Sequence, residues 1–342
     1  MRGIGIALVL VIIVGVAGGY YYWHTIAGLF QRTSVNLSEA SGGAMNVLLV
    51  GSDSREGLTD PADVNRFGRP GGRRSDTIML AQVIPSQQRG VLISIPRDLW
   101  VTVRHDGRSF QGKINSAYGY GPQAVIDTVY GLTGVPINHY VEVNFGGFRK
   151  MVDSIGGIDV CNRQSFYDTV IGFGLTTGPH HLNGLDALQY VRTRHATADG
   201  DFGRIKRQQE FLRAVMAKIG RPAVLGNPVR VNRLATAFAQ NVTVDQFFKL
   251  PDLVKLAVSL RRVGQNQLQT YSVPSYIGSA GGQSVVFVNQ TDAEPLFMAL
   301  RQVKDPAPVM ATPAPPGAAA PGRATAAAAK PAAAKPAQPT CS

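Results

Sequence analysis

Apolar residues along the chain follow two different periods, and these periods alternate. Short runs rich in branched apolar residues predict strands at 46–50, 78–84, 91–95, 139–144, 158–161, 187–191, 268–273 and 284–288. Apolar residues spaced three and four apart predict helices at 122–132, 145–155 and 203–219, with weaker ones around 243–260 and 291–303. Strands that alternate with helices are typical of an α/β domain.

The N-terminal segment predicts a membrane anchor. Residues 3–19 are almost wholly aliphatic, no charged residue lies between Arg2 and Arg32, and the aromatic run 20–23 follows. An aromatic belt suits a retained span better than a cleaved signal peptide, which is the alternative. We expect a transmembrane anchor at 1–23, a juxtamembrane linker at 24–44, an extracytoplasmic domain at 45–303 and an Ala/Pro/Lys-rich disordered tail at 304–342.

The formal charge of +12 favours anionic partners. Nucleic acid is excluded, because an external domain does not meet it and no nucleic-acid-binding motif is found. Phosphate-bearing lipids, wall polymers and the anionic membrane surface remain. Two cysteines, Cys161 and Cys341, lack metal-ligand spacing and are expected as separate thiols.

Arginines concentrate in one segment of the chain. If 187–191 is a strand, Arg192 and Arg194 follow it on one face. Arg204, Arg207 and Gln208 form a stripe on the helix expected at 203–219. Guanidinium groups from two elements that meet would bind phosphate in a bidentate manner. The alternative is a solvated helix face with surface arginines.

Charged residues also stand at the ends of three predicted strands. Asp53 follows strand 46–50, Asp76 precedes strand 78–84, and Arg97 follows strand 91–95. The short link between the last two strands predicts an antiparallel hairpin, which brings Asp76 near Arg97. Two carboxylates among arginines suit Mg²⁺. The alternative is that both aspartates are turn or capping residues paired with Arg55 and Arg74.

Three further features were weighed for chemistry. Lys113, which precedes Asn115 on an expected extended loop, could reach an oxyanion. The histidines His180, His181 and His195 lack the spacing of a zinc site. The Gly-, Pro- and Arg-rich segment 56–73 predicts a long loop between the two aspartate motifs.

The ordered set of motifs over residues 45–220 resembles the LytR–CpsA–Psr (LCP) family. The motifs of this chain that carry the resemblance are 46–55 (NVLLVGSDSR), 74–77 (RSDT), 95–98 (IPRD), 113–115 (KIN), 156–160 (GGIDV), 182–184 (LNG) and the arginine block 192–208. The resemblance implies an α/β/α fold with a central mixed sheet flanked by helices. It also implies an apolar groove for a prenyl chain, for which helices 122–132 and 145–155 are candidates.

The family activity implied is transfer of a phosphoglycopolymer from a polyprenyl-pyrophosphate carrier to a peptidoglycan hydroxyl, at the outer face of the cytoplasmic membrane. The metal ligands implied for Mg²⁺ are Asp53 and Asp76. The pyrophosphate ligands implied are Arg97, Arg192, Arg194, Arg204 and Gln208, with Lys113 nearby and with Arg55, Arg74, Asp201 and Arg207 as secondary members. Asp201 is preferred over Asp98 as the base.

Two other functions use the same residues. A polyprenyl-pyrophosphate-glycan hydrolase would use water as the acceptor. A non-catalytic wall-polymer binder or membrane regulator would bind anions without needing the carboxylates.

Overall fold

The computed structural model describes residues 25–39, 43–53, 75–194, 200–219, 228–263 and 267–311. The predicted span at 1–23, the whole of loop 56–73 and the residues after 311 lie outside this part of the chain. Within the described part, no helix is both long and apolar enough to cross a membrane.

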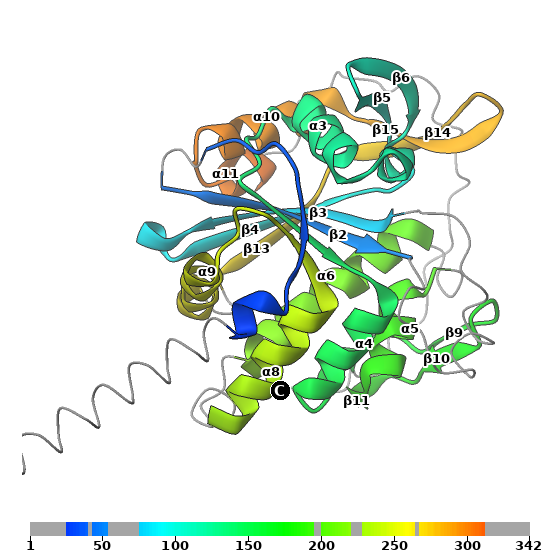
Figure 1. Ribbon diagram of the computed structural model, residues 1–342. Coiled ribbons are helices and arrows are strands. Elements are labelled where there is room, and N and C mark those ends of the chain that lie inside the picture. The colour runs from blue at the N-terminus through cyan, green and yellow to red at the C-terminus, as the bar shows by residue number, and fades with distance from the viewer. Residues whose placement is uncertain are drawn as a thin grey trace, which may run out of the picture.

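A seven-stranded mixed sheet forms the centre of the domain (Figure 1). Its strands, in spatial order, are β1 (Gln31–Thr33), β12 (Val242–Asp245), β7 (His139–Val143), β2 (Met45–Ser52), β3 (Ser75–Ile84), β4 (Arg89–Ile95) and β13 (Leu268–Ser272). The pairs β1–β12, β7–β2 and β4–β13 are parallel, and the other three pairs are antiparallel. The predicted α/β architecture with a mixed central sheet is therefore confirmed.

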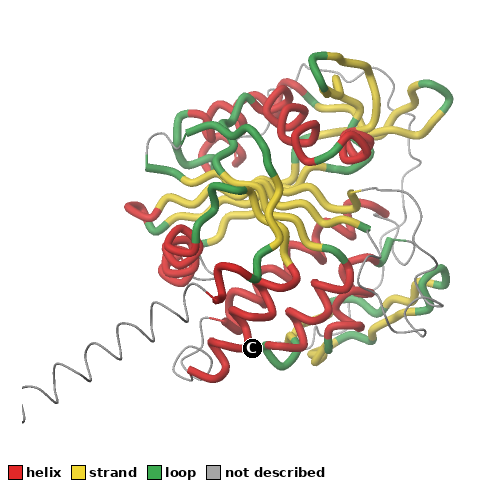
Figure 2. The backbone as a smooth tube through the Cα atoms, viewed as in Figure 1, coloured by secondary structure: helices red, strands yellow, loops and turns green. Residues whose placement is uncertain are grey.

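Helices cover both faces of the sheet (Figure 2). One face carries α3 (Pro122–Thr133), α10 (Gln290–Arg301) and α11 (Ala307–Ala311). The other carries α4 (Phe145–Ser154), α5 (Gly184–Arg192), α6 (Gly200–Ile219), α8 (Pro228–Asn241) and α9 (Leu250–Val263). Alternate residues of a strand point to opposite faces. Leu48 accordingly packs in the α3 layer, and Val47 packs with α8.

Short elements complete the domain. They are the hairpin β5 (Trp100–His105) and β6 (Arg108–Lys113), the hairpin β14 (Ser275–Ala280) and β15 (Gln283–Val288), the pair β8 (Ile158–Asn162) and β11 (Gly178–Leu182), the pair β9 (Phe166–Asp168) and β10 (Phe173–Leu175), and the 3-10 helices η1 (Pro85–Gln87) and η2 (Ile114–Tyr120). The predicted strands 46–50, 78–84, 91–95, 139–144, 158–161, 268–273 and 284–288 are confirmed, and so are the helices 122–132, 145–155, 203–219 and 291–303.

The strand predicted at 187–191 is wrong, because these residues belong to α5. All five residues are buried, so the sequence lacks the exposed polar positions that would have distinguished a helix from a strand. Asn183 caps this helix by accepting a hydrogen bond from the Asp186 amide at 2.9 Å. The helix predicted at 243–260 is also wrong at its start, where β12 precedes α9.

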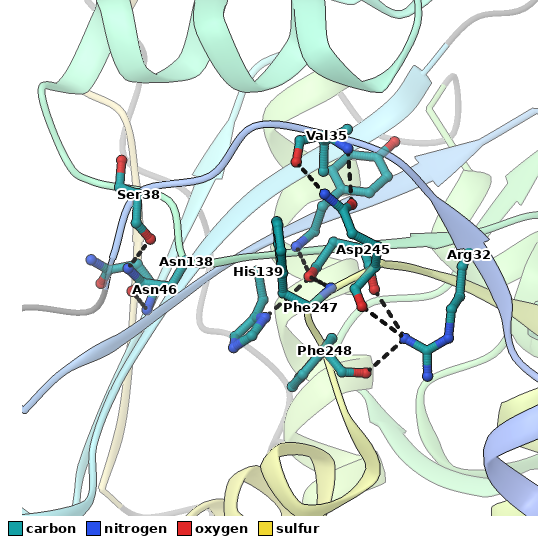
Figure 3. Close-up of polar contacts among 11 residues, drawn as sticks. Arg32, Val35, Ser38, Asn46, Asn138, His139, Asp245, Phe247 and Phe248 are labelled. Atoms are coloured by element: carbon teal, nitrogen blue, oxygen red, sulfur yellow. Dashed lines mark hydrogen bonds and ion pairs between the residues drawn. The ribbon is translucent and has the colours of Figure 1, made fainter.

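The ordered domain begins before residue 45 and extends past residue 303. β1 lies within the predicted linker, and Arg32 donates hydrogen bonds to the carbonyl groups of Asp245, Gln246 and Phe248 (Figure 3). At the other end, Met310 of α11 packs against the main core, although the tail was predicted to be disordered.

Cys161 in β8 is disulfide-bonded, which contradicts the prediction of a free thiol. Nothing in the sequence indicated this, because two cysteines alone form no recognisable disulfide framework.

Candidate functional site

Three strand ends meet at one edge of the central sheet. β2 ends where β3 begins, with Gly51 opposite Thr77. β4 ends there too, because Ile95 pairs with Ile78. This is the arrangement expected from the predicted hairpin, and it gathers the residues that follow β2, begin β3 and follow β4. We call this the catalytic edge.

A cluster of cations surrounds Asp98 just beyond β4. Lys113 Nζ lies 3.3 Å, Arg97 Nε 3.6 Å and an Arg194 Nη atom 3.7 Å from the carboxylate oxygens. All four side chains are partly exposed, at 19–30%. Three cations around one carboxylate leave an excess of positive charge that is accessible to an anion.

The backbone fixes Lys113 beside Arg97. Lys113 is the last residue of β6, rather than part of an extended loop as predicted. The amide of Asn115 then donates to the Arg97 carbonyl at 3.1 Å, and that of Ile114 donates to the Leu99 carbonyl at 2.8 Å. The start of η2 is therefore attached to the turn after β4.

Arg192 and Arg194 do not share a face, because α5 ends between them. Arg192 is the last residue of α5, and its guanidinium carbon lies 4.5 Å from the centre of the Phe145 ring. Arg194 follows the helix, and its amide donates to the buried Asp168 carboxylate at 2.9 Å. Asp168 thus holds the backbone that presents Arg194 to Asp98.

The stripe on α6 is buried, and not a solvated helix face. Arg204, Arg207 and Gln208 are only 3%, 8% and 8% exposed. Arg207 donates a hydrogen bond to the Thr193 carbonyl. Gln208 Nε2 donates to Thr77 Oγ1 at 2.9 Å and to the Val191 carbonyl at 3.2 Å.

These contacts assign roles within the stripe. Both bonds of Gln208 start from its amide nitrogen, so the residue attaches α6 to β3 and to the end of α5. It thereby fixes the position of the α6 stripe relative to β3 and α5. Arg207 is similarly engaged, with its guanidinium 5.4 Å from the centre of the Phe166 ring.

The remaining predicted residues are described to different extents. Asp53 follows β2 and Asp76 lies within β3, so both are at the catalytic edge. Asp201 lies in the first turn of α6. The side chains of Asp76 and Asp201 are outside the described part, as are all atoms of Arg55 and Arg74.

An acidic residue at this edge escaped the sequence reasoning. Glu142 pairs with Val50 near the end of β2, and it accepts hydrogen bonds from Tyr118 and from Tyr140, the latter at 2.8 Å. Burial, and then the negative charge of Glu142, raise the pKa of Tyr140 well above its ordinary value. Glu142 lies within the predicted strand 139–144, but no motif marked it as a site residue.

The fold and this edge define an α/β domain with a cationic, carboxylate-bearing site at one sheet edge. The model of the LytR_cpsA_psr family matches residues 25–302, and the chain belongs to this family.

Curated relatives agree with that assignment. The chain is 36% identical over 266 residues to the probable cell wall biosynthesis protein LcpB of Corynebacterium glutamicum, covering 77% of this chain and 62% of LcpB. It is 32% identical over 279 residues to the polyisoprenyl-teichoic acid–peptidoglycan teichoic acid transferase TagU of Enterococcus faecalis, covering 78% of this chain and 85% of TagU. The chain spans less than two thirds of LcpB, and 58% of LcpA from the same Corynebacterium.

Among solved structures, the LytR-Csp2A-Psr enzyme from Actinomyces oris superposes with a TM-score of 0.63 at 26% identity. The match covers 81% of this chain and 97% of that one.

Proposed function

We propose that the protein is a phosphotransferase that moves a phosphoglycopolymer from a polyprenyl-pyrophosphate carrier to a peptidoglycan hydroxyl. The observation that carries this proposal is the convergence of Arg97, Lys113 and Arg194 around Asp98 at the catalytic edge. A diphosphate is the substrate group that such a concentration of cationic donors suits best. The name of the TagU relative describes a transfer of this kind.

Mg²⁺ fits the donor set at the same edge. Asp53 follows Ser52, Asp76 follows Ser75, and Ser52 and Ser75 are paired residues of β2 and β3. Asp53 therefore directly follows β2 and Asp76 lies in β3, and these neighbouring strands are about 5 Å apart. Two carboxylates, with water and phosphate oxygens, are a typical Mg²⁺ environment. When bound, the ion would neutralise charge on the diphosphate.

In the proposed reaction, the oxygen of the acceptor hydroxyl bonds to the phosphorus that carries the glycan. The bond from that phosphorus to the bridging oxygen breaks, and polyprenyl phosphate leaves with the electron pair. Arg97, Lys113 and Arg194 would stabilise the charge on the phosphate oxygens. Asp201 is the proposed acceptor of the hydroxyl proton, because it lies in the first turn of the helix that carries Arg204.

The prenyl chain is proposed to lie on the α6–α9 face of the sheet. Leu49 and Ala81 are in its central strands, yet they remain partly exposed under the helices. Leu212 and Met216 of α6 pack on the same cluster and are also partly exposed. Central strands beneath helices are ordinarily fully buried, so this incompletely covered apolar surface suits a lipid chain.

The helices proposed to line the prenyl groove therefore differ from those predicted from the sequence, because α3 is replaced by α6 and α9. The predicted groove residues of α3, Ala124, Val125, Ile126 and Val129, are fully buried in the main core on the opposite face, with Leu132 packed against it. Met151 of α4 does lie on the proposed face. We propose a single N-terminal membrane anchor with the domain outside the cell, because a polyprenyl substrate resides in the membrane.

The test uses the full chain with a polyprenyl-pyrophosphate glycan, peptidoglycan fragments and Mg²⁺. Asp53→Ala and Asp76→Ala should each abolish transfer while leaving thermal unfolding unchanged. Asp106→Ala, at an exposed turn, is the matched control and should retain activity. Release of polyprenyl phosphate without any acceptor would indicate the hydrolase instead. Full cellular function of both variants would indicate a non-catalytic binder.

A further inference from the structure

Exposed basic residues are concentrated in one segment of the domain, remote from the catalytic edge. Residues 228–263 contain six basic and two acidic residues. All six basic side chains are exposed: Arg230, Arg233, Lys249, Lys255, Arg261 and Arg262. Of the two acids, Asp245 is fully buried and accepts hydrogen bonds from the amides of Tyr140 and Phe247. We call this surface, formed by α8, the 246–249 loop and α9, the basic face.

Apolar side chains are exposed among these cations. Phe247 is 56%, Val229 57% and Val258 44% exposed. On α9, Pro251, Lys255, Val258 and Arg262 are exposed at spacings of four, three and four, so they form one stripe. Exposed apolar residues interleaved with Lys and Arg are the pattern of surfaces that bind the headgroup region of a membrane.

The basic face adjoins the first described residues of the chain, 25–30. Ile26 and Phe30 pack in one cluster with Phe238 of α8, Phe248 of the loop and Leu256 of α9. In Figure 1 the first described turn, drawn in dark blue, lies between α8 and α9. The apolar sequence 3–23 joins the domain directly before this turn.

The opposite layer lacks this charge excess. Residues 290–305, which include α10, contain three acidic and two basic residues. One of these bases, Arg301, forms an ion pair with Glu294. The basic face is therefore a local feature and not the consequence of a uniformly basic domain.

We propose that the basic face lies on anionic phospholipid headgroups, an inference that rests on the membrane anchoring in the proposed function. The 246–249 loop follows β12, which runs antiparallel to β7, and β7 runs parallel to β2. The loop thus lies at the end of the sheet where β2 begins. β2 has eight residues, which places the catalytic edge about 25 Å from the lipid surface.

This orientation assigns a path to the prenyl chain. The partly exposed apolar residues around Leu49 and Ala81 lie between the basic face and the catalytic edge. The chain would leave the bilayer beside the 246–249 loop and follow β2 and β3 to the site. The diphosphate would then be held away from the membrane, on the side toward the peptidoglycan.

The experiment measures proximity to lipid in the full chain. The protein is reconstituted in nanodiscs of phosphatidylcholine, with or without phosphatidylglycerol, that contain a headgroup-nitroxide lipid. A fluorophore is attached at Phe247→Cys, and a matched one at Ser279→Cys on the exposed β14 hairpin. Quenching at Phe247→Cys should be strong with phosphatidylglycerol and weaker without it, whereas Ser279→Cys should stay unquenched in both.

Charge variants test the electrostatic part. Each Lys or Arg near an anionic membrane contributes about 1 kcal/mol, so neutralising one lowers the docked-to-undocked ratio about fivefold, and reversing its charge to Glu lowers the ratio further. Lys249→Glu with Lys255→Glu should abolish the quenching. The matched pair Arg108→Glu with Lys304→Glu, exposed on the other layer, should not change it.

Two outcomes would overturn the proposal directly: no quenching at Phe247→Cys, or equal quenching with and without phosphatidylglycerol. A third would be that a soluble polyglycerol phosphate binds the basic face and lipid does not. Transfer measured in detergent separates this test from the proposed function. The Lys249→Glu, Lys255→Glu variant should keep its detergent activity, so loss of docking alone leaves the assignment of the enzyme intact.

Discussion

Two neighbouring glutamines on α6 allow the site architecture to be tested separately from stability. Gln208 holds the helix to Thr77 and to the Val191 carbonyl at the catalytic edge. Gln209 holds it to Ser94 Oγ of β4 and to the Tyr271 carbonyl of β13, both at 3.1 Å, and not to β3. Replacing either by leucine removes two hydrogen bonds and retains a similar volume.

The expected destabilisation follows from burial. A buried hydrogen bond contributes about 0.5–1.5 kcal/mol, and abandoning its partner raises the cost to about 1–3 kcal/mol. Gln208 is 8% exposed, so Gln208→Leu should lower the free energy of unfolding by about 2–4 kcal/mol. Gln209 is half-buried, so water can replace part of its bonding. Gln209→Leu should cost about 1–2 kcal/mol.

The assay combines thermal unfolding with titration of inorganic pyrophosphate in the presence of Mg²⁺. Both variants should unfold at lower temperature, Gln208→Leu by about 5–10 °C. Only Gln208→Leu should also weaken pyrophosphate binding, by about tenfold, because Arg204 and Arg207 lose their fixed position. Equal weakening in the two variants, or unchanged binding in Gln208→Leu, would refute the positioning role.

Three other changes have defined outcomes. Arg194→Ala should weaken pyrophosphate binding about tenfold and reduce its salt dependence, and titrations at two ionic strengths would contradict this if the slope stayed the same. Burial, and then the nearby Glu210 carboxylate, raise the pKa of Tyr190 above its ordinary value of 10.0. The stability from this protonated hydroxyl is present below that value and declines as the pH rises above it; Tyr190→Phe should flatten this alkaline decline in denaturant unfolding. A Cβ at Gly184 would lie 2.3 Å from the Arg149 carbonyl oxygen, so Gly184→Ala should destabilise the protein by about 1–3 kcal/mol in the same measurement, and a neutral effect would show that α4 and α5 can separate freely.

The sheet edge could be predicted because short-range signals determine it. The link between β3 and β4 is short, so the antiparallel pairing and the nearness of the β3 start to the β4 end followed directly. The parallel neighbours were beyond prediction. β1 pairs with β12 more than two hundred residues away, and no local pattern encodes that partnership.

Two elements were missed or misassigned because the spacing of apolar residues alone does not identify them, although other sequence signals do. The β5–β6 hairpin has Asp106-Gly107 at its turn between alternating residues, a sequence typical of tight hairpins. Asn183 before α5 is a typical N-cap, and it outweighs the strand-like composition of a run buried on every side. Arg192 and Arg194 were both expected at the site, but only the helix end explains why their side chains diverge.

The pairing of β1 with β12 has a mechanical consequence. A force applied along the axis of β1 would load the three paired residues and the Arg32 contacts together, in shear. A strand that must break several bonds at once resists detachment far better than one that unzips bond by bond. β1 is therefore a firm edge of the domain against a load along its own axis.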